Sequence, residues 1–167
     1  MAHPPPPNWQ NIASFYAGRP VTIGVDQRGP YQAGTGAAES GNIFLGSGHQ
    51  KNLQAFVQAW MKAKTDQQRM GLAAQGANIL PVLLHEAMHN RNFSGTGLPS
   101  AWNEQQAVAL GSELIPDMLQ RFFGVKIGSP VSDAFAKAAK ARGEYQGAYA
   151  INRLNGTPPI LFTGRSA

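Results

Sequence analysis

The sequence has no cysteine among its 167 residues, which excludes disulfides and thiolate metal sites. Any metal ion must therefore be bound by histidine, aspartate or glutamate. Charged side chains are also scarce, at 14% of the chain against roughly 25% in ordinary soluble domains. So few charges are expected either in a small loop-rich protein or in one whose surface is partly covered by partner subunits.

Dense basic clusters and long apolar runs are absent as well. The net charge is +5, but the basic residues are scattered and are not interleaved with aromatics, so nucleic acid is not an expected partner. A weak preference for anionic surfaces stays open. No apolar run approaches the roughly 20 residues of a membrane helix, and the first residues lack the basic and apolar regions of a secretory signal. We expect a soluble protein made in the cytoplasm, with no membrane partner.

The length suits one folded domain with an extended segment at each end. Residues 1–8 contain four consecutive prolines and predict an extended arm. Residues 155–167, rich in glycine and proline, predict an extended C-terminal tail. The folded domain then spans residues 9–154, and subunits of a larger assembly are the partners expected to contact the two end segments.

Apolar periodicity predicts a mainly helical α+β domain with a small β-sheet that precedes the fourth helix. Gly76 is expected to end the third helix, Asn78 to cap the fourth and Pro81 to lie in its first turn. A bend is expected near Pro116, and Gly34 is expected in a loop. The predicted helices cover residues 9–17, 49–64, 66–75, 79–90, 102–123 and 132–141, and the predicted strands cover 21–25 and 41–46.

The fourth helix carries the sequence His85-Glu86-Ala87-Met88-His89, an HExxH motif. Residues four apart lie on one helix face, so both imidazoles can bind one zinc ion, each at about 2.0–2.1 Å. Glu86 is then placed to reach the water on the metal. The apolar run before the motif would bury this helix, and the alternative is two core histidines that merely hydrogen-bond to neighbours.

A catalytic zinc needs a third protein ligand, and Glu104 is the best candidate. It is the only charge on a helix stripe that includes Ala107 and Gly111, whose small size would let the two helices approach closely. His3 and His49 precede the motif, and no third histidine has the metzincin spacing. The alternative is an exposed Glu104 in a first helical turn, where the helix dipole favours a carboxylate.

The HExxH motif followed by Asn103-Glu104-x-x-Ala107 resembles the thermolysin-related gluzincin metallopeptidases, above all the small minigluzincins. The resemblance implies a zincin-like domain in which His85, His89 and Glu104 bind Zn2+ and Glu86 is the general base. It also implies a peptide or protein substrate that pairs with an edge strand above the zinc. Residues 42–46 match that strand by position, and a core strand is the alternative.

Other features of the site stay open at the level of sequence. Tyr145, Tyr149 or Arg153 is a candidate oxyanion donor, and Asn103 is a candidate partner of the metal-binding histidines. Only 14 residues separate His89 from Glu104, so the resemblance implies a shallow or open substrate cleft.

Two classes of function follow from the sequence, and a third is less favoured. The first is an active zinc metallopeptidase, acting on proteins or on cell-wall peptides. The second is a structural or assembly subunit, for example of a phage-like virion, that retains the zincin fold with or without activity. The intact Glu86 favours the first, because a purely structural zinc site needs no base. A regulatory protease that cleaves a repressor-like partner is less favoured, since no separate binding domain is seen.

Overall fold

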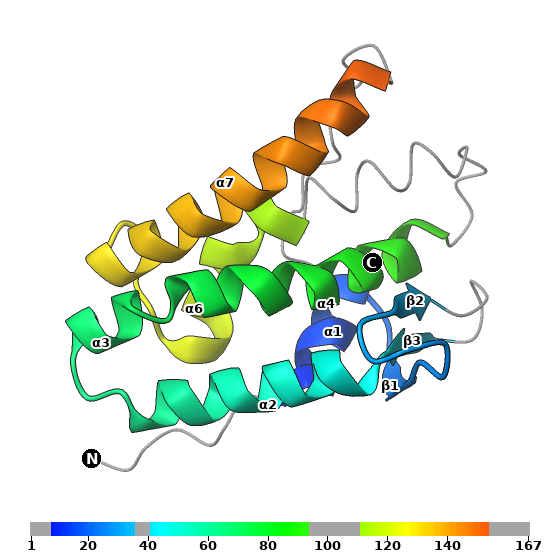
Figure 1. Ribbon diagram of the computed structural model, residues 1–167, viewed down its shortest axis with the longest axis horizontal. Coiled ribbons are helices and arrows are strands. Elements are labelled where there is room, and N and C mark those ends of the chain that lie inside the picture. The colour runs from blue at the N-terminus through cyan, green and yellow to red at the C-terminus, as the bar shows by residue number, and fades with distance from the viewer. Residues whose placement is uncertain (1–7, 36–40, 94–110, 154–167) are drawn as a thin grey trace.

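The computed structural model describes the backbone of residues 8–35, 41–93 and 111–153. Over these residues the protein is mainly helical, with three strands in one small sheet (Figure 1), so the α+β class is confirmed. The elements are α1 Trp9–Ala17, β1 Thr22–Val25, β2 Ala33–Thr35, β3 Asn42–Leu45, α2 Ser47–Lys62, α3 Asp66–Met70, α4 Ala73–Phe93, α6 Ile115–Phe123 and α7 Pro130–Arg153.

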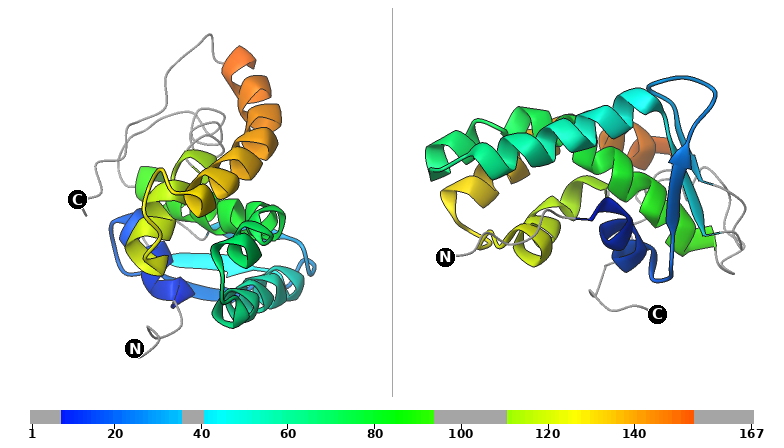
Figure 2. Two further views of the ribbon diagram at one scale, coloured as in Figure 1. Left: turned by 90° about the vertical axis from the view of Figure 1, so that its left-hand side faces the viewer. Right: turned by 90° about the horizontal axis from the view of Figure 1, so that it is seen from below.

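Helix α4 is the centre of the arrangement, because it packs against α1, α2, α7 and the strands β2 and β3. The sheet lies at one end of the helices, beside the second half of α4 and the start of α2 (Figures 1 and 2). The HExxH motif falls in this second half of α4. The fold therefore brings the motif next to the sheet.

Local sequence signals explain several of the confirmed helices. Asn8 caps α1 by accepting a hydrogen bond from the backbone N–H of Asn11 at 3.1 Å. Gly18 ends α1 with a φ of 72°, in the left-handed region that glycine tolerates. In α2, Phe56 and Trp60 lie on the buried stripe that the periodicity predicts.

The sheet has the strand order β1-β3-β2, with β1 parallel and β2 antiparallel to β3. Strand β3 is therefore central, and the expectation that residues 42–46 form an edge strand is wrong. The edge strand that packs against α4 is β2, which the sequence analysis assigned to a loop. Because β2 has three residues with Gly34 in the middle, only its pairing with β3 shows it to be a strand.

Helix α4 begins earlier than the sequence predicts. Gly76 does not end a helix and Asn78 is not a cap, since both lie inside α4, as does Pro81. A Cβ on Gly76 would lie 2.5 Å from Cε2 of Phe135 on α7. The glycine thus permits close packing of α4 against α7. This packing stabilises a continuous helix, although Gly76 and Asn78 are local signals that favour a helix end.

The predicted helix over 102–123 is interrupted where it is described. Residues 111–113 are helical, Leu114 forms a turn, and α6 then begins at Ile115 with Pro116 in its first turn. A proline is tolerated there because the first N–H groups of a helix have no intrahelical partner. Residues 102–110 lie outside the described part of the chain, as do residues 1–7 of the predicted arm and the predicted tail at 155–167.

The core forms where α1, α2, α4, α6 and α7 meet the inner side of the sheet. Tyr16, Ile43, Phe56, Met88 and Phe135 are among its fully buried side chains. In the described segments, no helix combines the length and the apolar character that crossing a bilayer requires.

Candidate metal centre

The two histidines of the motif converge at one point. The Nε2 atoms of His85 and His89 are 3.0 Å apart, and the two rings are inclined at 76°. This arrangement follows from their spacing of four residues on the same face of α4. His89 is buried, whereas 20% of the His85 side chain is exposed. The pair therefore lies at the boundary between the core and the surface.

The distance between the two nitrogens suits a hydrogen bond between the rings, and it is also close to the separation of two zinc ligands. Two nitrogen ligands of a tetrahedral zinc, each at about 2.1 Å from the metal, lie about 3.4 Å apart. The observed 3.0 Å is close to this, so a small rotation of the two rings opens the position. In the described residues, no group of three or more histidines and carboxylates is placed to hold a metal. Glu104, the predicted third ligand, lies outside the described residues.

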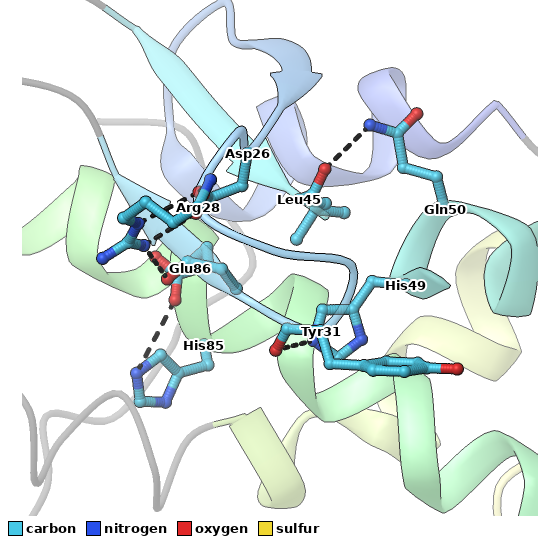
Figure 3. A network of polar contacts seen from close by, with 9 residues as sticks. Asp26, Arg28, Tyr31, Leu45, His49, Gln50, His85 and Glu86 are labelled. Atoms are coloured by element: carbon cyan, nitrogen blue, oxygen red, sulfur yellow. Dashed lines mark hydrogen bonds and ion pairs between the residues drawn. The ribbon is translucent and has the colours of Figure 1, made fainter. Parts of the chain in front are cut away.

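Glu86 is a buried carboxylate, with 8% of its side chain exposed. Its Oε1 atom is 4.0 Å from Nε2 of His85, so a single water molecule can bridge the two groups. Its charge also acts on the guanidinium of Arg28, and Figure 3 shows Glu86 between Arg28 and His85. A carboxylate within reach of a shared water molecule is placed where it can act as a general base.

Gly111 lies close against the backbone of α4 at the first histidine. A Cβ on Gly111 would be 3.0 Å from the carbonyl oxygen of Pro81 and 3.4 Å from the amide nitrogen of His85. The prediction that Gly111 lets its helix approach the HExxH helix is therefore confirmed.

The residue after the motif fixes the end of α4 to the rest of the fold. Asn90 is fully buried and its Oδ1 accepts hydrogen bonds from Nη2 and Nε of Arg19, at 2.7 and 3.1 Å. Its side-chain amide donates to the carbonyl oxygen of Asn42 at 3.2 Å. Asn90 thus links the helix that carries both histidines to the central strand β3 and to the α1–β1 connection.

Several sequence candidates are placed away from the histidine pair. Nε2 of His49 lies 2.9 Å from the carbonyl oxygen of Tyr31. Asp117 is engaged elsewhere, since it accepts hydrogen bonds from Tyr16 at 2.5 Å and from Arg121 at 2.8 Å. The side chains of Tyr145, Tyr149 and Arg153, like Asn103 and His3, lie outside the described residues.

An ion pair next to Glu86 was not predicted from the sequence. Nη2 of Arg28 lies 2.7 Å from Oδ2 of Asp26, and Nε donates to Oδ1 of Asp26 at 3.0 Å. Hydrogen bonds from Arg28 lower the pKa of Asp26. The hydrogen bond to Asp26 chiefly raises the pKa of Arg28, with a smaller contribution from Glu86. The pair comes from the β1–β2 loop, and no local sequence signal connects it with α4.

The site thus combines two converging imidazoles, a buried carboxylate and a solvent-exposed guanidinium. No protein-family model matches the sequence, and neither a curated protein nor a solved structure matches the chain.

Proposed function

We propose that the protein is a zinc-dependent metallopeptidase of the gluzincin type. The observation that carries the proposal is the convergence of His85 and His89, with Nε2 atoms 3.0 Å apart, beside the buried carboxylate of Glu86. Histidines at this spacing with an adjacent glutamate suit a catalytic zinc, which leaves an open position for water. In the proposal, Glu104 completes the ligand set with His85 and His89.

The residues of the chain then have distinct roles. A zinc ion held by His85, His89 and Glu104 would acidify a bound water molecule and polarise the peptide carbonyl. Glu86 would accept the proton from that water and pass it to the leaving amine. The link from Asn90 to Arg19 and β3 holds the end of α4, and hence His89, in position.

The substrate in this proposal lies along the open edge of β2. In the described part of the chain, this strand packs against α4 and pairs with β3 on one side only. Apart from the Ala33 carbonyl, which accepts a hydrogen bond from Arg28, its outer backbone groups are therefore available to an extended peptide. Of the three strands that the structure describes, β2 is the edge strand packed against the helix with the motif. It takes the role that the sequence analysis gave to residues 42–46.

The test compares zinc-loaded wild type with the Glu86→Gln variant on a peptide mixture whose products are read by mass spectrometry. We expect the variant to retain zinc and to lose hydrolysis by at least about 100-fold, because it lacks the base. Glu113→Gln is the matched control, since Glu113 is an exposed carboxylate beyond α4. Equal activity of Glu86→Gln and wild type would reject the assigned base.

A further inference from the structure

The loop that carries Arg28 is held tightly against the start of α2. The amide nitrogen of Gly46 donates to the carbonyl oxygen of Gln32 at 2.8 Å, and that of His49 donates to Pro30 at 3.1 Å. A Cβ on Gly46 would lie 2.2 Å from the carbonyl oxygen of Gly29. The loop therefore has little freedom to move relative to the sheet and to α2.

The guanidinium of Arg28 is oriented by the groups around it. Asp26 accepts hydrogen bonds from Nε and from Nη2, and the carbonyl oxygen of Ala33 accepts a second one from Nη2 at 3.1 Å. These bonds use three of the five N–H groups of an arginine. Both N–H groups of Nη1 have no hydrogen-bond partner in the described part of the chain, and 64% of the side chain is exposed.

Arg28 lies across the open edge of β2. Gln32 pairs with Gly46 through a backbone hydrogen bond, and Gly34 lies opposite Phe44 in the antiparallel register. In such a ladder the intervening residue, Ala33, points its N–H and C=O away from β3. Nη2 of Arg28 donates a hydrogen bond to this outward carbonyl oxygen. A Cβ on Gly34 would lie 3.0 Å from its Nη2 atom, so the glycine leaves room for the guanidinium.

We propose that Arg28 is a specificity-determining residue that binds a carboxylate on the peptide at the end of the β2 edge. This inference rests on the proposed function. Because Arg28 covers the Ala33 carbonyl, a peptide strand cannot pair there and must end or turn beside the guanidinium. An arginine whose fork is already oriented binds a carboxylate with little further loss of side-chain freedom. The carboxylate belongs either to an aspartate or glutamate side chain or to the C-terminus of the peptide.

The experiment compares wild type with Arg28→Gln on two peptide pairs. One pair differs by an internal Asp or Asn, and the other by a C-terminal carboxylate or amide. In one of the two pairs, we expect the kcat/KM of wild type to be about tenfold higher for the member with the carboxylate. Arg28→Gln should lose this preference. Arg121→Gln is the matched control, since Arg121 also pairs with an aspartate but lies on α6.

Binding of the same peptides to the zinc-loaded Glu86→Gln variant, with and without Arg28→Gln, separates this inference from the proposed function. If wild type cleaves no peptide, the metallopeptidase proposal fails, and a carboxylate preference in fluorescence anisotropy that needs Arg28 still supports the anion site. If Arg28→Gln weakens the binding of carboxylate and neutral peptides by the same factor, or if no peptide binds, the inference is overturned. The pair that loses its preference identifies the source of the carboxylate.

Discussion

Replacing Asn90 with alanine tests whether the end of the HExxH helix is held by a buried polar link. Asn90 is fully buried, and its side chain makes three hydrogen bonds, two from the half-buried Arg19 and one to the carbonyl oxygen of Asn42. The substitution removes all three. It leaves the hydrogen bond from Arg19 to the backbone carbonyl of residue 90, at 3.0 Å, so the arginine keeps one partner.

The expected loss follows from these bonds. A hydrogen bond to a charged group contributes about 1.5–3 kcal/mol, and a buried neutral one about 1 kcal/mol. Because two of the three share one oxygen atom, we expect Asn90→Ala to lower the free energy of unfolding by about 2–4 kcal/mol. For a chain of this size that corresponds to a melting temperature lower by about 5–15 °C.

Chemical denaturation followed by circular dichroism at the helical band measures the loss. Asn78→Ala is the matched control, because Asn78 lies on the same helix and also accepts from an arginine, Arg142, but is exposed. The control should change stability by less than about 0.5 kcal/mol. A double-mutant cycle with Arg19→Gln should give a coupling above about 1 kcal/mol. If Asn90→Ala and Asn78→Ala lose the same small amount, the buried link is not important for stability.

Three further predictions concern other parts of the fold. Burial raises the pKa of Tyr16, and the hydrogen bond to Asp117 raises it further. The contribution of Tyr16 to stability is therefore complete below about pH 10 and falls as the pH rises further. Tyr16→Phe should reduce the loss of stability at alkaline pH in denaturation curves, and an unchanged alkaline slope would contradict this. Gly111→Ala puts a Cβ 3.0 Å from the carbonyl oxygen of Pro81, and should cost about 1–3 kcal/mol in denaturation and weaken zinc binding; wild-type values for both would show that the close approach is not required. Glu104→Ala should weaken zinc affinity by more than about tenfold in a chelator competition assay, and unchanged affinity would place the third ligand elsewhere.

Most helices were predictable because their signals are local. Helix α1 has an asparagine cap and a terminal glycine, and α2 has a regular apolar stripe. The start of α4 was not predictable, because Gly76 and Asn78 resemble a helix end and a new beginning. Packing of Phe135 against Gly76 decides the conformation there, and that contact joins residues far apart in the sequence.

Part of the candidate site was likewise predictable from local sequence, and part depends on the tertiary fold. His85 and His89 converge because a helix places residues four apart on one face, which the sequence alone determines once the helix is known. The role of β2 as the edge strand depends on its pairing with β3, which no local pattern in a three-residue strand reveals. Arg28 was missed for the same reason, since only the tertiary fold brings the β1–β2 loop beside Glu86.

Zinc content of the purified protein tests the central claim most directly. Elemental analysis of wild type should give about one zinc per chain after reconstitution, and His85→Ala should lose it. His49→Ala is the matched control and should keep the zinc, because His49 contacts the carbonyl oxygen of Tyr31 and has no part in the proposed site. Absence of zinc from the reconstituted wild type, or equal zinc in wild type and His85→Ala, would contradict the proposed metal centre.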